Sequence, residues 1–285
     1  MNISVVIVAS GDHIDRYTNA LKQIEVLRNQ TVQPLEIIYV EQTLDGNLYY
    51  NKLPIQMNNG FYRYIALQYN DHKNLFSVSW CRNVGIYNAK GDVVLVLDCD
   101  YIFDEHYIEK LTQLQVDDIY VGWNTIYYTD DTMKTDCMQY SIFPLEMKNP
   151  RGISDRIYNL PYHDDQRKLI TTPKDGHVGG LQIFNRQWFI DNLVGFSEDM
   201  FAWGKEDNDL YARAKALIKV KRVFEQTVFH LHHRQKQKQK LINQVVMERN
   251  VKNVANTHNA FKQVGLGSIN SPHPIYKDSV KWGLL

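Results

Sequence analysis

Short apolar runs rich in Val and Ile alternate with amphipathic runs over the first 124 residues of the chain. An unbroken apolar run is typical of a strand buried on both faces, whereas apolar residues at helical spacing are typical of a helix that covers a sheet. The pattern predicts strands over residues 3–9, 35–40, 61–67, 93–97 and 119–123, and helices over 14–27, 80–89 and 105–114. This alternation favours an α/β fold with a mostly parallel, doubly wound sheet.

The pattern becomes irregular in the second half of the chain. Residues 125–175 mix Tyr, Asp, Pro and Asn without a regular period, which predicts an irregular insert or lid. Regular structure is expected again over residues 176–185, then as a helix over about residues 204–217, and as one strand or two over residues 220–231.

Acidic residues stand where predicted strands end. Glu41 follows the second strand, and Asp98 and Asp100 follow the apolar run 93–97. Ligands of a doubly wound sheet bind at the carboxyl ends of its strands, so these side chains are expected to share one crevice. Carboxylate oxygens are hard ligands that suit Mg²⁺ or Mn²⁺. A lone Asp-x-Asp is common by chance, but its place behind a buried strand favours a metal or sugar-phosphate site.

A histidine cluster follows the last predicted strand. His230 and His232 share a face if the strand continues, whereas His230 and His233 share a face if the chain turns helical. One imidazole together with the two carboxylates would make a mixed oxygen and nitrogen site that suits Mn²⁺. The alternative is a surface cluster without a ligand.

Residues 203–211 read Trp-Gly-Lys-Glu-Asp-Asn-Asp-Leu-Tyr, with three carboxylates within four positions. Acids in the first turn of a helix are favoured by the free amides and the macrodipole, which is a purely structural explanation. That explanation leaves Trp203 and Gly204, directly in front of the acids, unaccounted for. An aromatic face beside a carboxylate suits a site that holds a polar ring and removes a proton from it.

Arg82 opens the segment Arg-Asn-Val-Gly in the helix before the Asp98 strand. A guanidinium at this point is suited to holding a diphosphate, and equally to a structural salt bridge. The residues leave both interpretations open.

The overall charge gives no indication of a strongly charged partner. The chain of 285 residues has 32 Lys and Arg against 32 Asp and Glu, so no global field recruits nucleic acid or a membrane. The basic run 234–240 is typical of a solvated helix face, with contact to an anionic acceptor or surface as the minority interpretation. Three scattered cysteines favour a reducing compartment, and no apolar run reaches the roughly 18 residues of a membrane span, so a soluble, cytoplasmic protein is expected.

Taken together, these motifs resemble the GT-A glycosyltransferases. Residues 3–41, the Arg82 segment and the Asp98–Asp100 pair resemble the nucleotide-binding half of family 2 enzymes. Residues 179–181, 195–197 and 203–211 are similar to the carboxyl-terminal galactosyltransferase motif, in which a Gly-Gly strand leads to Gly-Phe and then to Trp-Gly-Gly-Glu-Asp. β-1,4-Galactosyltransferases, chondroitin-polymerase-like enzymes and polypeptide N-acetylgalactosaminyltransferases carry this motif.

The resemblance implies a metal site and a nucleotide site. Asp100 would bind Mn²⁺ or Mg²⁺ directly, and Asp98 would contact both the metal and the ribose. A histidine after the last strand, best matched by His230, would complete the metal site, with His232 and His233 as the further candidates. Glu41 would lie near the nucleotide base.

The resemblance also implies an acceptor side. Gly179 and Gly180 would let the donor sugar approach the backbone. Asp207 would be the general base of an inverting enzyme, with Glu206 as a ligand of the acceptor hydroxyl. Trp203 would stack on the acceptor ring, with Gly204 beside it in the substrate site.

Two positions depart from the motif. Lys205 replaces the second glycine, which is expected to alter acceptor contacts, and Asn208 replaces an acid of the galactosyltransferases, so N-acetylglucosamine is not assumed as the acceptor.

The expected organisation is a GT-A domain over residues 1–234 followed by a helical extension over 235–285. Within the domain, residues 1–124 would form the nucleotide-binding half, 125–175 the insert, and 176–234 the acceptor and metal half. The expected reaction moves a sugar from a UDP-sugar to an acceptor hydroxyl of a saccharide or glycosylated acceptor. The alternatives are a retaining transferase, a nucleotidyltransferase, and a catalytically silent protein that binds sugar or nucleic acid.

Overall fold

The computed structural model describes residues 1–10, 14–42, 60–67, 76–114, 119–128, 180–198, 204–231 and 233, with the backbone alone for 120–128 and 222–227. Its helices are α1 (Ile14–Arg28), α2 (Val78–Asn88), α3 (Tyr107–Leu111), α6 (Arg186–Leu193) and α7 (Glu206–Lys215). Its strands are β1 (Ile3–Ser10), β2 (Glu36–Gln42), β3 (Tyr62–Leu67), β4 (Val93–Asp98), β5 (Tyr101–Ile102), β6 (Ile119–Tyr128), β7 (Leu181–Asn185) and β8 (Val220–His230).

The strands form one eight-stranded sheet in the order β3-β2-β1-β4-β7-β6-β8-β5. Strands β3, β2, β1 and β4 are parallel, and β6 and β8 are parallel to each other. The strands β7 and β5 run antiparallel to their neighbours. The expected α/β class with a mostly parallel central sheet is therefore confirmed.

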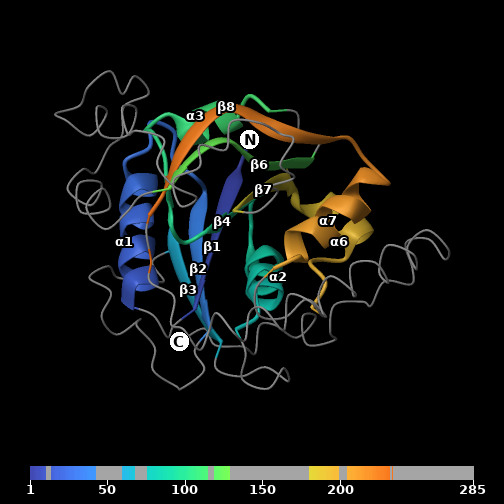
Figure 1. The fold of residues 1–285 in the computed structure, drawn as a ribbon, viewed down its shortest axis with the longest axis horizontal. Coiled ribbons are helices and arrows are strands. Elements are labelled where there is room, and N and C mark those ends of the chain that lie inside the picture. Colours follow the sequence, from blue (N-terminus) through green and yellow to red (C-terminus); the bar gives the residue numbers. More distant parts are fainter. Residues whose placement is uncertain are drawn as a thin grey trace.

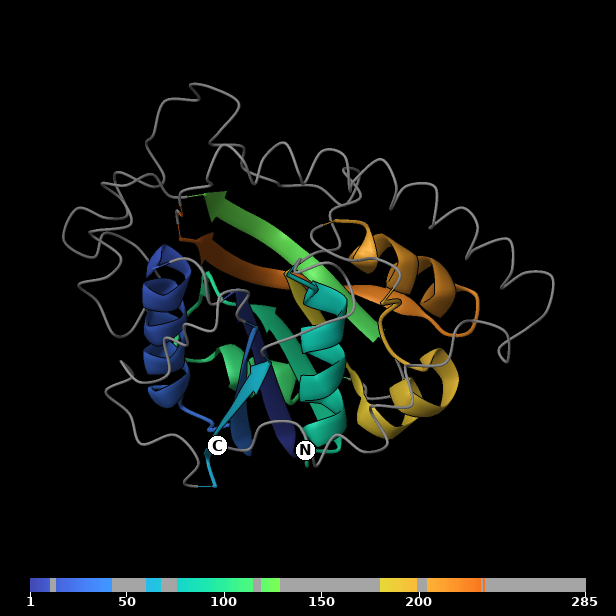
Figure 2. The same ribbon diagram turned by 90° about the horizontal axis from the view of Figure 1, so that it is seen from below.

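Helices cover both faces of the sheet. Helix α1 lies on one face, and α2, α6 and α7 lie on the other (Figures 1 and 2). Side chains of a strand point alternately to the two faces, so β1 serves both layers. Its residues Val5 and Ile7 pack in the cluster that contains α1, whereas Val6 and Val8 pack in the cluster that contains α2. The fully buried apolar run predicted from the sequence is thus a strand between two helical layers.

Helix α2 lies unusually close to the sheet because of Gly85. A Cβ atom at Gly85 would lie 2.3 Å from Val6 Cγ1, closer than two carbon atoms can pack. Ser77 caps the helix by accepting a hydrogen bond from the Trp80 amide. Together these contacts fix the helix that carries Arg82.

Several helices and strands differ from those that the hydrophobic pattern predicts. Strand β6 continues to Tyr128, beyond the end predicted at residue 123, and residues 220–230 form one strand. The pattern missed β5 and α6, because a two-residue strand has no period and α6 is buried only at Phe189 and Leu193. Residues 129–179 and 234–285 lie outside the described part, so the insert, the basic run and the extension stay predictions.

In the part of the chain that the structure describes, no helix has the length and apolar character needed to cross a membrane. The cysteines Cys81 and Cys99 in that part are buried free thiols.

Candidate active site and metal centre

The predicted metal-site residues that the structure describes lie where β4 ends and where β8 ends. Asp98 is the last residue of β4, and Asp100 lies in the turn to β5. The pairing of β5 with β8 sets Tyr101 opposite His230, and the Leu231 amide donates a 2.7 Å hydrogen bond to the Asp100 carbonyl. The short strand β5 therefore brings the turn after β4 next to the histidine segment.

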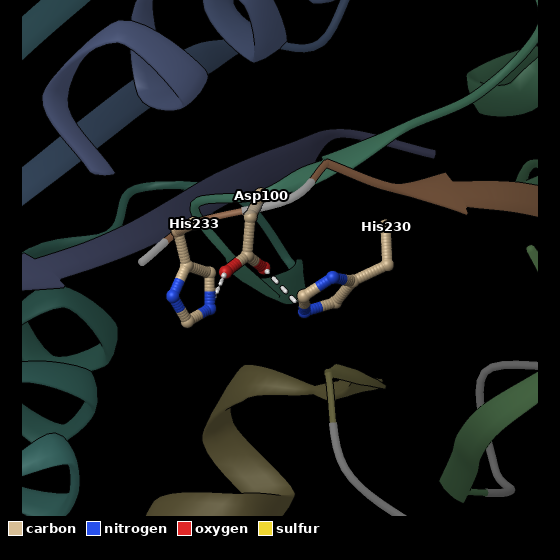
Figure 3. A group of neighbouring side chains, drawn as sticks. All are labelled: Asp100, His230 and His233. Atoms are coloured by element: carbon tan, nitrogen blue, oxygen red, sulfur yellow. Dashed lines mark ion pairs between the residues drawn. The ribbon is translucent and has the colours of Figure 1, made fainter. Parts of the chain in front are cut away.

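Asp100 lies between two histidine side chains (Figure 3). His230 Nε2 lies 3.6 Å from Asp100 Oδ1, and His233 Nε2 lies 3.3 Å from Asp100 Oδ2. The potential ligand atoms of the three residues all lie within 4.8 Å of one another. One carboxylate oxygen and two imidazole nitrogens form a donor set that suits Mn²⁺.

The charges in this cluster also suit a cation. Burial alone would raise the pKa of Asp100, but His230, His233 and Arg16 outweigh it and hold the pKa well below its usual range. Burial lowers the pKa of His230, and Asp100 offsets this only in part, so the imidazole is neutral near pH 7. Among the described residues, the buried Asp100 Oδ1 has no hydrogen-bond partner. An ionised carboxylate beside a neutral imidazole is the state that metal binding requires.

The residues that meet in this cluster differ in part from the predicted metal ligands. Asp98 lies outside the three-residue cluster because its carboxylate is engaged by Arg82. His233 stands in the cluster, and His232 lies outside the described residues. His230 and His233 meet at one aspartate because the chain leaves β8 at Leu231, which belongs to no helix or strand.

A second group of charges surrounds the guanidinium of Arg82, which is only 1% exposed. Arg82 Nη2 donates to Asp98 Oδ1 at 2.8 Å, and Nη1 donates to Asp207 Oδ1 at 2.5 Å. Glu206 Oε1 lies 3.6 Å from the same Nη1. This Arg82 network links the acid at the end of β4 to the two acids that open α7.

The network holds one positive charge against three carboxyl groups. Burial would lower the pKa of Arg82, but Asp207, Asp98 and Glu206 outweigh it and raise the pKa further above its usual value. Burial, and next the charge of Asp207, raise the pKa of Glu206 to about 8. Glu206 therefore keeps its proton near pH 7 and can donate a hydrogen bond, whereas Arg82 stays charged.

Gln182 is a site residue that the sequence did not reveal. It is fully buried in β7, and its Nε2 donates to Asp207 Oδ1 at 2.7 Å. A buried glutamine inside the apolar run of β7 is the signal that identifies it, because an amide in the core needs a polar partner. Gln182 and Arg82 together fix the direction of the Asp207 carboxylate.

Asp209, the third acid of the motif, has a structural role. Its carboxylate pairs with Arg213, with Nη2 at 2.7 Å, and both side chains are buried. Arg213 also donates to the carbonyls of Leu193 and Gly195 at the end of α6. Two of the three acids, Glu206 and Asp207, thus belong to the Arg82 network, whereas Asp209 stabilises the packing of α6 against α7.

Comparisons with known proteins agree with this geometry. Residues 4–193 match the profile described as Glycosyl transferase family 2, which is two thirds of the chain. The chain belongs to glycosyl transferase family 2. Residues 167–234 also match the profile described as the N-terminal domain of galactosyltransferase. A search of the curated proteins found no match.

One solved structure, that of GalNAc-T7, shows the same fold. A crystal structure of GalNAc-T7 with UDP, GalNAc and Mn²⁺ is 16% identical, with a TM-score of 0.59 over 90% of this chain. This chain spans 48% of the length of that one. S. aureus TarS 1–349 in complex with UDP-GlcNAc is 12% identical, with a TM-score of 0.49, and the match covers 92% of this chain and 73% of TarS.

In this family 2 chain, Asn83 joins α2 to the segment after α6. Its Nδ2 donates to the Phe196 carbonyl at 2.9 Å, and its Oδ1 accepts from the Phe196 amide at 2.7 Å. Gly195 has φ +110°, and a Cβ there would lie 2.8 Å from Asn83 Oδ1. The Phe196 ring in turn lies 5.1 Å from the Arg82 guanidinium carbon. The Arg-Asn-Val-Gly segment and the Gly-Phe motif are therefore one packing unit.

The glycines predicted to contact the substrate have different structural surroundings. A Cβ on Gly180 would lie 2.4 Å from the Tyr101 ring, so the lack of a side chain makes room for Tyr101. The Tyr101 ring contacts His230 edge-on, with centroids 5.1 Å apart. Gly204 donates its amide to Glu206 Oε2 at 2.9 Å. Gly179 and Trp203 lie outside the described residues, so their roles stay predictions.

Glu41 lies at the carboxyl end of β2, as predicted, but its side chain is fully buried. The Tyr64 hydroxyl donates to Glu41 Oε2 at 2.7 Å. Its expected place near a nucleotide base stays a prediction.

Lys205 occupies a backbone conformation that favours glycine. Its φ of 76° and ψ of −9° lie in the left-handed region, directly before α7. A side chain there costs roughly 1 kcal/mol relative to glycine. We therefore expect Lys205→Gly to raise the free energy of unfolding by about 1 kcal/mol, measured by urea denaturation. Lys215→Gly, within α7, is the control and should lower the free energy of unfolding. A loss of stability in Lys205→Gly would contradict the view that Lys205 is strained.

Proposed function

We propose that the chain is a metal-dependent glycosyltransferase that moves a sugar from a UDP-sugar to a hydroxyl of a saccharide or glycosylated acceptor, with inversion at the anomeric carbon. The Arg82 network carries this proposal, because it joins Asp98 to the acids that open α7. Asp100 of the metal cluster lies two residues after Asp98, in the turn from β4 to β5. Groups suited to donor and acceptor chemistry are thus neighbours in one site.

Asp100, His230 and His233 would hold the metal, with Mn²⁺ preferred over Mg²⁺ because two of the three ligands are imidazoles. A divalent metal there would offset the negative charge that develops on the leaving diphosphate. GalNAc-T7 was solved with UDP, GalNAc and Mn²⁺, so these are the first ligands to test.

Asp207 would act as the general base. Its carboxylate takes the proton of the acceptor hydroxyl, and the hydroxyl oxygen forms a bond to the anomeric carbon. The bond from that carbon to the diphosphate oxygen breaks, and UDP leaves with the bonding electrons. A positioned base contributes roughly 10²–10⁴-fold to the rate. Glu206, protonated near pH 7, would donate a hydrogen bond to the acceptor hydroxyl.

Release of UDP from a panel of UDP-sugars, with Mn²⁺ and with EDTA, tests the proposal. We expect release with at least one donor, and its loss in EDTA. Asp100→Ala should weaken Mn²⁺ binding by at least about tenfold without unfolding the protein, since it removes the shared carboxylate. His233→Ala and His230→Ala should each weaken it as well. Activity that persists in EDTA, or unchanged Mn²⁺ binding by Asp100→Ala, would contradict metal dependence.

Glu206 should make stability depend on pH. Burial, together with the charge of Asp207, raises its pKa to about 8, whereas a glutamate of the unfolded chain titrates near about 4.3. The folded protein thus holds a proton that the unfolded chain has released, so stability falls as pH rises from about 4.3 to about 8. Between about pH 5 and pH 9, wild type should lose at least about 1 kcal/mol more than Glu206→Gln in urea unfolding.

The control for this experiment is Asn208→Gln, in the same helical turn but without a titratable group, which should follow wild type. If wild type and Glu206→Gln keep a constant difference in stability across this range, the assignment of a protonated Glu206 is wrong.

The reducing, cytoplasmic location expected from the cysteines stays a prediction, and nucleic acid is not part of this proposal.

A further inference from the structure

Helix α1 carries two buried side-chain amides that the proposed reaction does not use. Asn19 and Gln23 are both fully buried, although the helix lies against the sheet through apolar residues such as Ile24 and Leu27. A buried amide is costly unless it is hydrogen-bonded, so its partners indicate what it stabilises.

Gln23 holds both ends of the turn that presents Asp100. Its Nε2 donates one hydrogen bond to the Asp98 carbonyl and one to the Tyr101 carbonyl, both at 2.8 Å. An amide nitrogen has two protons, and here both are used. One side chain of α1 therefore spans the segment from Asp98 to Tyr101.

Asn19 holds the segment between the two histidines. It lies one helical turn before Gln23, and its Nδ2 donates to the Leu231 carbonyl at 3.3 Å. The Leu231 amide donates to the Asp100 carbonyl, which completes a chain of contacts from α1 through both ligand segments. The two amides reach backbone atoms next to Asp100, His230 and His233.

We propose that Asn19 and Gln23 are positioning residues of the metal centre, which set the spacing between the turn of Asp100 and the segment of His230 and His233. The inference rests on the proposed function, since it assumes that this cluster binds a divalent metal. Residues that orient metal ligands typically change metal affinity about 10–100-fold when they are replaced.

Gln30 supplies a matched control. It is a buried glutamine near the end of α1, and its Nε2 donates to the Asp104 carbonyl at 2.8 Å while its Oε1 accepts from the Ile108 amide at 2.9 Å. It fastens the segment before α3 rather than the turn of Asp100. The change from Gln to Met keeps the length of the side chain and removes the amide at either position.

The experiment titrates the full chain with Mn²⁺, without a donor sugar, and follows free Mn²⁺ by EPR. Gln23→Met should weaken Mn²⁺ binding by at least about tenfold, whereas Gln30→Met should stay within about twofold of wild type. Asn19→Leu removes the hydrogen bond to Leu231, which is longer than those of Gln23, and should weaken binding less than Gln23→Met. If Gln23→Met does not fold, Asn19→Leu still tests the proposal.

Co²⁺ bound in place of Mn²⁺ gives a spectroscopic test of geometry. Gln23→Met and Asn19→Leu should change the visible absorption of the Co²⁺ protein, and Gln30→Met should leave it as in wild type. Wild-type affinity and spectra in both α1 variants would overturn the inference alone. Equal losses in Gln23→Met and Gln30→Met would also overturn it, because they indicate general destabilisation. A wild-type chain that binds no Mn²⁺ would overturn the proposed metal centre together with the inference.

Discussion

Replacing Asp207 with Asn should lower sugar transfer by at least about 10²-fold and leave UDP-sugar binding close to wild type. The Asn side chain keeps an oxygen that can accept the hydrogen bonds from Arg82 and Gln182, so the local geometry is retained. It lacks a basic oxygen, so it cannot take the proton of the acceptor hydroxyl. Initial rates of transfer together with calorimetric donor affinity separate the two effects.

Asp191→Asn is the control for this variant, since it makes the same change on the exposed side of α6. It should leave both rate and affinity unchanged. If Asp207→Asn transfers sugar at nearly the normal rate, the inverting mechanism with Asp207 as base is wrong. A retaining mechanism would then be the better explanation, and the anomeric configuration of the product, measured by NMR, decides between the two.

Replacing Arg82 with Met should destabilise the protein by about 3 kcal/mol, because it leaves buried carboxylates without their cation. Arg82 contacts Asp98, Asp207 and Glu206, and Asp207 is only 14% exposed. Urea denaturation measures the loss. The other role considered for Arg82 is contact with the diphosphate. UDP-sugar binding without metal, compared between the folded variant and wild type, tests it: weaker binding by the variant would indicate that contact.

A double-mutant cycle tests the origin of this loss. Combining Arg82→Met with Asp207→Asn removes the cation and the charge that it neutralises, so the double variant should lose at least about 1 kcal/mol less than the sum of the single losses. Arg213→Met combined with Asp207→Asn is the control, since Arg213 pairs with Asp209, and its losses should add. Additive losses for Arg82 and Asp207 would mean that their ion pair contributes nothing to stability.

Most of the fold of residues 1–114 could be predicted from local patterns. The apolar runs before Glu41 and Asp98 form buried parallel strands, and both acids stand at carboxyl ends as expected. Local patterning succeeds here because a strand between two helical layers must be apolar on both faces. It could not separate the acids by role, since Glu41 is buried against Tyr64 and Asp209 against Arg213, whereas Asp207 faces Arg82.

The residues that form the metal cluster could be identified only from the tertiary structure. The sequence left open whether the chain after β8 stays extended or turns helical; the structure assigns Leu231 to no helix or strand and sets His233 beside Asp100, while His232 lies outside the described residues. Position along the chain fixes side-chain direction only inside a regular element, so periodicity carries no information there. The two-residue strand β5, which sets Tyr101 opposite His230, was too short to leave a pattern.

The sequence by itself determined the fold class, the family resemblance and the residue types of the site, because these depend on local periodicity and on short motifs. The tertiary structure alone decided which of those residues meet. Arg82 and Asp207 are 125 positions apart, and Asn19 reaches Leu231 across 212 positions. Such pairings arise from strand order and from helix packing on the sheet, which bring distant segments together and which no local pattern encodes.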